Sequence, residues 1–330
     1  MFTQTAFSRA PGKIILCGEQ FVVLGAPAIA MAINLYSRVE ARPMNKPGVE
    51  VDVDLPLKDL SLSRKYSARE SAELLRPLRI AAEATLDRIT KREAGVRVNV
   101  DCEIPVGAGL GSSASTTVAI ASAVSRSMGT SLSREEIFKL AFVPERFLHG
   151  NPSGVDQATC IYGGVIRYKR PFKVEPLLIK NSPELVLCDT GIHHKTKTLV
   201  GSVVRNSKKN KEQFREHLEE VRSICQGVVK ALKRGDDEDL GALMSRNHEL
   251  LRKIKVSHPK LDRLVDAALK AGALGAKLTG AGGGGCIIAV CEDAKARQKI
   301  SRSLTRQGGK PFKISRDACG VVSSLGRALK

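Results

Sequence analysis

The chain lacks several features that would define its class at once. It contains no tryptophan, and aromatic residues make up only 4% of its 330 residues. No run of 18 apolar residues occurs, so we predict no membrane-spanning helix. The first ten residues lack the apolar segment of a secretory signal peptide. None of the eight cysteines forms a Cys-x-x-Cys pair, which argues against zinc and favours reduced, buried thiols. We therefore expect a cytoplasmic protein.

The composition is that of a globular protein with a basic surface. Hydrophobic residues make up 42% of the chain, enough for one large or two medium domains. The formal net charge of +19 fits a solvated surface, an attraction for anionic small molecules, or nucleic-acid binding. No aromatic RNA-binding motif or zinc-finger spacing accompanies the charge. We expect a charged surface, with no nucleic-acid partner and no membrane partner.

A glycine-rich stretch organises the rest of the chain. It runs from Pro105 to Ser115 and has glycines at 107, 109 and 111, which allow tight turns and close approach of a ligand. The following segment, 116–125, is small or apolar on all sides, as in a buried helix. Free N–H groups at the start of such a helix form a phosphate site. The alternative is a glycine-rich turn before a core helix.

A second glycine run, 280–285, precedes the apolar segment 286–290. Consecutive glycines cost conformational entropy, so something must approach that backbone closely. The alternative is a flexible loop, which the ordered segments on both sides argue against.

Three charged side chains are candidates for chemistry. Lys13 lies between a Pro-Gly turn and an apolar strand, where it either reaches solvent or projects into a site. Glu145 lies near the end of an expected helix and needs a compensating cation. Asp156 follows the turn at 150–154 and enters a strand or helix. For either acid the alternative is a surface salt bridge.

The pattern of apolar residues predicts mixed strands and helices in both halves of the chain. We expect strand, loop and strand over residues 1–42, and a Ser133–Glu136 capping box opening a helix that Pro144 disturbs. A helix over 67–92 is expected to be interrupted near Pro77. Further strands are predicted at 49–55, 96–102, 165–168, 185–188 and 286–290, and further helices at 209–233, 237–254, 258–271 and 294–305. We place a domain boundary near residue 180, giving domains 1–180 and 181–330.

Three segments together resemble the motifs of the GHMP small-molecule kinases. They are Pro11-Gly12-Lys13, Pro105 to Ser113, and Lys277 to Gly285, and their order and spacing agree over nearly the whole chain. Within that family the sequence is similar to the mevalonate kinase branch, through three further stretches. These are 10–16, His149 to Asp156, and Asp189-Thr190-Gly191 with Thr196 downstream.

The resemblance implies a fold and an activity. The fold is α+β, with an N-terminal domain like domain 2 of ribosomal protein S5 and a ferredoxin-like C-terminal domain. The activity is ATP- and Mg²⁺-dependent phosphorylation of the primary hydroxyl of mevalonate, by a homodimer. The alternatives within the family are phosphomevalonate kinase and other small-alcohol or sugar kinases. A catalytically inactive, nucleotide-sensing relative is an alternative of another class, against which the joint presence of Lys13, Ser113, Glu145 and Asp156 argues.

The resemblance also implies residue roles. Asp156 and Lys13 would be catalytic, with Asp156 taking or holding the proton of the substrate hydroxyl and Lys13 easing its ionisation. Ser113 and Glu145 would ligate Mg²⁺, and both are hard oxygen donors. The residues that would hold ATP are Pro105, Gly107, Ala108, Gly109, Leu110, Gly111, Ser112 and Ser113. The residues that would contact the acceptor are Lys13, Glu19, Gln20, Asp156, Thr196, Gly282 and Gly283.

One position departs from the family pattern. Where mevalonate kinases usually have Gly-Glu-His, this chain has Gly18-Glu19-Gln20. Glutamine can donate and accept hydrogen bonds but cannot carry charge. The departure bears on the acceptor substrate more than on phosphoryl transfer.

Overall fold

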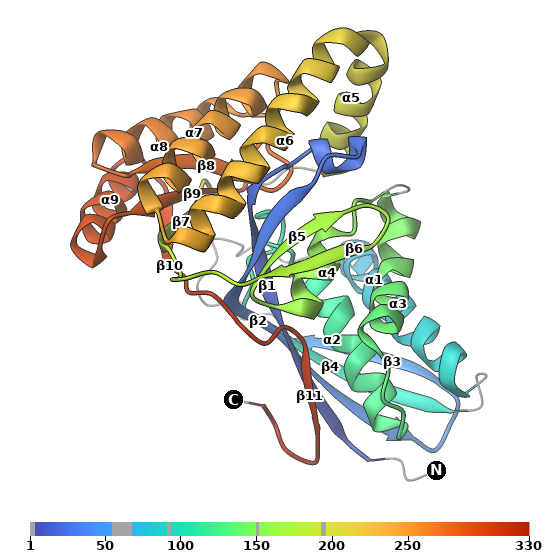
Figure 1. Ribbon diagram of the computed structural model, residues 1–330. Coiled ribbons are helices and arrows are strands. Elements are labelled where there is room, and N and C mark those ends of the chain that lie inside the picture. The colour runs from blue at the N-terminus through green and yellow to red at the C-terminus, as the bar shows by residue number, and fades with distance from the viewer. Residues whose placement is uncertain (1–3, 55–67, 91–93, 150–151, 193–195, 330) are drawn as a thin grey trace.

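The structure is a computed structural model, and it describes residues 4–54, 68–90, 94–149, 152–192 and 196–329. Two β-sheets, each with its own helices, lie side by side (Figure 1). None of the described helices is long and apolar enough to cross a membrane.

The first sheet is built mainly from the N-terminal half. Its strand order is β11-β1-β2-β4-β3, and β5 pairs with the start of β2 and with β6. All neighbours are antiparallel except β3 and β4. The strands are β1 (Ala6–Cys17), β2 (Ala28–Met44), β3 (Gly48–Asp54), β4 (Gly95–Cys102), β5 (Val165–Lys169), β6 (Lys173–Leu177) and β11 (Val322–Leu325).

Helices α1 to α4 accompany this sheet. They are α1 (Ala68–Thr90), α2 (Ser112–Ser127), α3 (Arg134–His149) and α4 (Val155–Tyr162). The expected buried helix is α2, which packs on β1 and β2 and is surrounded by α1, α3 and α4. Its small residues allow this close packing on all sides, and almost all of them are buried.

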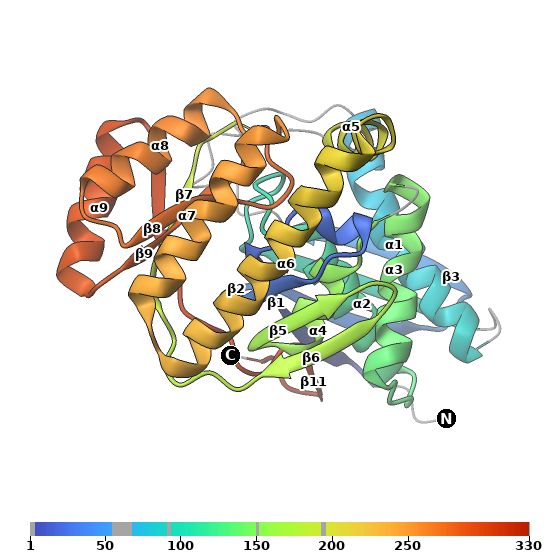
Figure 2. The same cartoon turned by 45° about the horizontal axis from the view of Figure 1, so that its top comes forward.

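The second sheet has the strand order β10-β7-β9-β8, and all its neighbours are antiparallel. Its strands are β7 (Glu184–Asp189), β8 (Gly275–Thr279), β9 (Cys286–Cys291) and β10 (Lys310–Lys313). Its helices are α5 (Thr196–Lys209), α6 (Lys211–Arg234), α7 (Asp237–Lys253), α8 (Pro259–Lys270) and α9 (Ala294–Arg306). Numbered in chain order, the four strands lie 4-1-3-2, which is the ferredoxin-like arrangement expected. Figure 2 shows the helices of this half.

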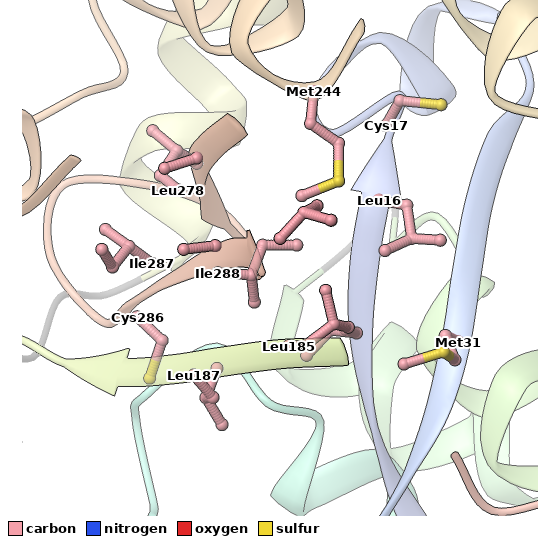
Figure 3. Close-up of a cluster of buried hydrophobic side chains, with 14 of the residues drawn as sticks. Leu16, Cys17, Met31, Leu185, Leu187, Met244, Leu278, Cys286, Ile287 and Ile288 are labelled. Carbon is pink, nitrogen blue, oxygen red and sulfur yellow. The ribbon is translucent and has the colours of Figure 1, made fainter. Parts of the chain in front are cut away.

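One apolar core joins the two sheets. Figure 3 shows Leu16 and Met31, from β1 and β2, beside Leu185 of β7, Met244 of α7 and Ile288 of β9. These side chains are essentially inaccessible to solvent. Because close-packed interiors resist deformation, this shared core fixes the C-terminal end of β1 and the first residues of β2 against the second sheet.

Several expectations about single elements need correction. Helices α1 and α3 run without interruption through Pro77 and Pro144. A proline removes one helical hydrogen bond, and burial of residues such as Ala82 and Phe138 outweighs that loss. The capping box is confirmed, since Ser133 and Glu136 exchange side-chain-to-backbone hydrogen bonds.

Other elements were not predicted from the sequence. A short 3-10 helix, η1 (Phe21–Leu24), lies between β1 and β2. The other additional elements are α5, β6, β8, β10 and β11. β11 pairs with β1, so the end of the chain returns to the first sheet. The division at residue 180 stays a prediction about folding units, and this returning strand belongs to the first sheet.

Candidate active site

Lys13 and Asp156 meet at the centre of the site. Lys13 Nζ lies 3.0 Å from Asp156 Oδ1 and donates to the carbonyl of Gly109 at 2.9 Å. The Lys13 side chain is only 2% exposed, whereas that of Asp156 is 36% exposed. Asp156 lies in the first turn of α4, where the positive end of the helix dipole favours a carboxylate. The pair therefore places a buried cation behind a carboxylate that is open to a ligand.

The first glycine loop has the backbone that the sequence predicted. Gly107, Gly109 and Gly111 have backbone φ angles of 77°, 79° and 79°, a region that residues with a Cβ atom rarely adopt. Gly111 is the N-cap of α2, and no side chain caps the helix start. The first N–H groups of α2 are thus available to an anion, as in other phosphate sites.

Ser113 and Glu145 also lie together. Ser113 Oγ donates to Glu145 Oε1 at 2.9 Å, although 32 positions separate the two residues. Adjacent oxygens in an octahedral Mg²⁺ shell, with bonds of 2.0–2.1 Å, are about 2.9 Å apart. The separation and the donor types both fit two neighbouring ligands of that ion. In the described part of the chain, no group of three or more His, Cys, Asp and Glu side chains offers a protein-only metal site.

The two glycine runs pack backbone against backbone. A Cβ on Gly109 would lie 3.2 Å from the carbonyl oxygen of Thr279, and one on Gly280 would lie 3.0 Å from that of Gly109. A Cβ on Gly285 would lie 2.7 Å from the carbonyl oxygen of Ala108. The sequence predicted that something approaches these glycines closely. At Gly109, Gly280 and Gly285 it is the backbone of the other glycine run.

Gly282 and Gly283 have a different close neighbour. The Gly283 N–H donates to the carbonyl of Val256 at 2.8 Å, and a Cβ on Gly282 would collide with the same carbonyl. Thr196 begins α5, and its side chain is outside the described part of the structure. Residues 150 and 151 of the turn before Asp156 are likewise outside it.

The loop after β1 is buried. Glu19 and Gln20 are 1% and 5% exposed. Gln20 Nε2 donates to the carbonyl of Ala281 at 2.6 Å, and this bond fixes which way the amide points. Gln20 also has a φ of 64°, a strained value for a residue with a side chain. Glu19 Oε2 and Gln20 Oε1 are buried acceptors without a protein partner.

Sequence reasoning missed a second buried lysine in the site. Lys277 of β8 forms an ion pair with Glu19, and neither side chain is more than 1% exposed. Thr279, also on β8, accepts from the Ile15 N–H at 2.8 Å. Lys277 was named in the sequence only as the first residue of the third family motif, beside the glycine run, and it was given no role.

Comparisons with known proteins identify the family of the chain. The family model for the GHMP kinases N terminal domain matches residues 76–164, and the one for GHMP kinases C terminal matches residues 228–310. The chain belongs to the GHMP kinase family, and its two sheets with their helices are the two-domain fold of that family.

Within the family, the chain is similar to mevalonate kinases over most of its length. That of Thermococcus onnurineus is 40% identical, over 96% of this chain and 98% of the relative. That of Methanocaldococcus jannaschii is 36% identical, over 88% of this chain and 94% of the relative. A solved structure of the L. major mevalonate kinase in complex with R-mevalonate has a TM-score of 0.80 and 31% identity, covering 94% of this chain and 95% of that chain.

Proposed function

We propose that the chain transfers the terminal phosphoryl group of ATP to the primary hydroxyl of mevalonate, forming 5-phosphomevalonate and ADP. The mevalonate kinases that match it over nearly their whole length support this substrate. The observation that carries the proposal is the position of Lys13 Nζ between Asp156 Oδ1 and the Gly109 carbonyl. Through these two contacts Lys13 connects Asp156, the proposed proton acceptor, to the glycine loop that would hold the phosphates.

The reaction forms one bond and breaks one bond. The acceptor oxygen attacks the terminal phosphorus of ATP, and the bond from that phosphorus to the ADP oxygen breaks. Asp156 Oδ accepts the hydroxyl proton, and the ammonium of Lys13 stabilises the negative charge on the attacking oxygen. Phosphoryl transfer depends mainly on such positioning and charge neutralisation. The N–H groups at the start of α2 hold the phosphates in line.

Ser113 and Glu145 would hold Mg²⁺. Their oxygen separation and their hard donor atoms support this assignment. When bound, the ion neutralises phosphate charge. Ser113 lies in the first turn of α2, beside the phosphate loop, so these two ligands would keep the ion next to the phosphates.

The acceptor would lie against Asp156, Glu19 and Gln20. Because Gln20 Nε2 is engaged by Ala281, its free atom is the oxygen, which can only accept a hydrogen bond. Together with a carboxylate, this environment favours hydroxyl groups and disfavours a second phosphate. It supports mevalonate over phosphomevalonate as the acceptor.

Two further properties stay proposals. We propose a homodimer, which light scattering coupled to gel filtration would test. We also propose a cytoplasmic location, which the eight free cysteines support because reduced thiols persist there.

The function is tested by measuring ADP release with mevalonate, phosphomevalonate, galactose and homoserine side by side. We expect turnover with mevalonate, with kcat/KM at least about 100-fold above the other three, since buried polar groups left unpaired by a wrong substrate discriminate strongly. Preferred turnover of another acceptor contradicts the proposal. ATP hydrolysis without any acceptor dependence also contradicts it.

A further inference from the structure

A buried ion pair joins the two halves behind the reacting groups. Lys277, on β8 of the second sheet, pairs with Glu19 in the loop after β1 of the first sheet. The Lys277 ammonium also donates to the carbonyls of Ile15 at 3.3 Å and Leu278 at 2.5 Å. All three donor positions of the ammonium are thus used, and one of its partners, Ile15, is two residues from Lys13.

Burial makes this pair interdependent. Removing one member of a buried ion pair leaves an uncompensated charge and is strongly destabilising. Burial raises the pKa of Glu19, whereas the Lys277 ammonium lowers it. The Lys13 ammonium acts in the same direction as Lys277. Cys17, the last residue of β1, lies two positions before Glu19. Burial raises the pKa of its thiol, so this neighbour stays neutral.

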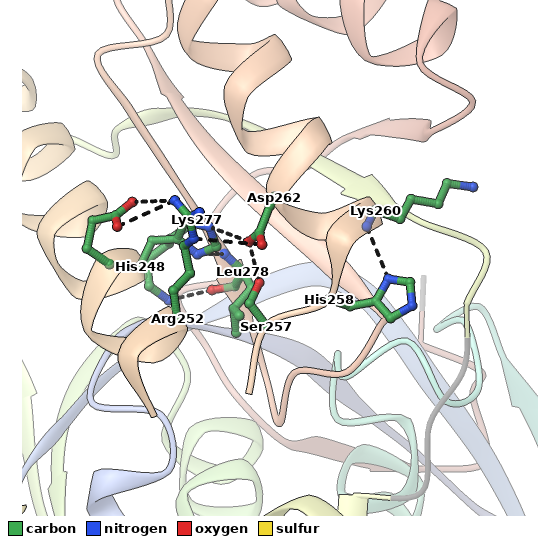
Figure 4. Close-up of polar contacts among 9 residues, drawn as sticks. His248, Arg252, Ser257, His258, Lys260, Asp262, Lys277 and Leu278 are labelled. Atoms are coloured by element: carbon green, nitrogen blue, oxygen red, sulfur yellow. Dashed lines mark hydrogen bonds and ion pairs between the residues drawn. The ribbon is translucent and has the colours of Figure 1, made fainter. Parts of the chain in front are cut away.

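Among the described contacts, the only charged partner of Lys277 is Glu19. Figure 4 shows the polar contacts of the residues near Lys277, among them His248, Asp262 and Leu278. The nearby ring of His248 is neutral, since burial lowers its pKa to about 4. His248 Nδ1 accepts from the Leu278 N–H at 3.4 Å, and Nε2 lies 3.2 Å from Asp262 Oδ1, at an angle that makes no hydrogen bond. His248 therefore supports the backbone of β8 without competing for Glu19.

The pair uses only one oxygen of the Glu19 carboxylate. The other, Oε2, is buried and has no hydrogen-bond partner in the protein. The same holds for Oε1 of Gln20, the next residue in the sequence. Buried acceptors without a partner cost free energy unless a ligand supplies a donor. ATP phosphates cannot serve, because they are anionic acceptors themselves. A hydroxyl of the acceptor can, and mevalonate carries a second hydroxyl besides the one that reacts.

We propose that Lys277 is a positioning residue for the acceptor substrate, holding the Glu19 carboxylate so that its Oε2 accepts a hydrogen bond from an acceptor hydroxyl. This role rests on the proposed function, since it takes mevalonate as the acceptor. Lys277 itself contacts neither substrate. It acts through Glu19, by fixing the position of the carboxylate and by keeping it ionised.

Thr279 provides a matched control. Like Lys277, it projects from β8 to the backbone of Ile15, accepting from the N–H at 2.8 Å and donating to the carbonyl at 3.3 Å. Unlike Lys277, it carries no charge and makes no contact with Glu19 among its described hydrogen bonds. Thr279→Val therefore weakens the same contact between the halves and leaves the charge on Glu19 compensated.

The test measures kcat and the KM values of mevalonate and ATP for wild type, Lys277→Met, Lys277→Arg, Thr279→Val and Glu19→Gln between about pH 6 and about pH 9. For Lys277→Met we expect the mevalonate KM to rise about tenfold or more at pH 7, the loss expected for one hydrogen bond to a charged group. The increase should shrink as the pH rises, because Glu19 without its cation ionises only at higher pH. The ATP KM should change less than about threefold.

The other variants separate charge from structure. Lys277→Arg should restore the mevalonate KM in part and the pH profile fully. Glu19→Gln should raise the mevalonate KM at every pH, and it keeps the proposal testable if Lys277→Met does not fold. Thr279→Val should lower the melting temperature without a new pH dependence.

Two outcomes overturn the proposal. One is a Glu19→Gln enzyme with a normal mevalonate KM. The other is a Lys277→Met enzyme whose mevalonate KM and pH profile match those of Thr279→Val. A wild type that is inactive on mevalonate contradicts the proposed function, and this role with it. An active wild type with either outcome contradicts the role alone.

Discussion

The ammonium of Lys13 lies 3.0 Å from Asp156 Oδ1 and 2.9 Å from the carbonyl oxygen of Gly109. Lys13 and Asp156, which are 143 positions apart in the sequence, thus form one ion pair in the site. Lys13 reaches this point because β1 passes directly beneath the glycine loop, where the Lys13 N–H also donates to the carbonyl of Leu110 at 2.9 Å. The strand, the loop and α4 are locked together around the reacting groups.

The Ser113–Glu145 pair predicts a specific metal dependence. Ser113→Ala and Glu145→Gln should each raise the Mg²⁺ concentration for half-maximal activity by about tenfold and lower kcat, because each removes one hard oxygen ligand. The measurement is initial rate against free Mg²⁺ at saturating substrates.

A control for these variants lies on the same helix. Glu136 is at the opposite end of α3 and caps it through Ser133. Glu136→Gln should lower stability and leave the Mg²⁺ titration unchanged. Unaltered titrations for both Ser113→Ala and Glu145→Gln would remove the metal assignment.

The contact between the glycine runs predicts a strict requirement at Gly109. Gly109→Ala places a methyl group at a φ of 79° and 3.2 Å from the Thr279 carbonyl oxygen. We expect the ATP KM to rise at least about tenfold as the loops separate, since small displacements at a site are costly.

Gly164 offers the matched control, with a φ of 61° and open space where its Cβ would lie. Gly164→Ala should cost about 1–2 kcal/mol of stability from backbone strain alone, with an unchanged ATP KM. A normal ATP KM in folded Gly109→Ala would show that the loop contact is not needed for nucleotide binding.

His248 predicts a pH dependence of stability. Burial lowers its folded pKa to about 4, below the ordinary 6.5, so the unfolded chain binds a proton that the folded chain does not. This contribution is fully present above pH 6.5 and is lost as the pH falls toward 4. A difference of this size corresponds to at most about 3 kcal/mol. His248→Gln should flatten the free energy of unfolding over this interval, measured by urea denaturation.

A second histidine, which is only partly buried, provides the comparison for His248. His217 on α6 is less buried, and burial lowers its pKa more weakly. His217→Gln should therefore change the slope of stability against pH less than His248→Gln does. Equal slopes for wild type and His248→Gln would contradict a buried, neutral His248.

Local patterns in the sequence predicted the parts of the site that depend on local structure. Glycines at 107, 109 and 111 allow tight turns, and a helix that is small or apolar on all sides is typically buried, so the turning loop and the buried helix were both predicted. The roles of Ser113, Glu145 and Asp156 came from family resemblance, and the structure brings Ser113 to Glu145 and Asp156 to Lys13.

Contacts between distant segments were not predictable in the same way. Lys277 and Glu19 are 258 positions apart, and neither residue has a local pattern that names its partner. The pairing of β11 with β1 is likewise set by the tertiary fold. Pro77 was misread because the local cost of a proline is visible in the sequence, whereas the burial that offsets it is not.

The central claim is that Asp156 and Lys13 together carry phosphoryl transfer to mevalonate. The most direct measurement is the single-turnover rate of phosphomevalonate formation by wild type, Asp156→Asn, Lys13→Met and the double variant, each checked for folding by circular dichroism. We predict that each single variant loses at least about 100-fold in rate with ATP affinity nearly intact, and that the double variant loses far less than the product of the two. A folded Asp156→Asn enzyme that forms phosphomevalonate at a near-normal rate would contradict the account.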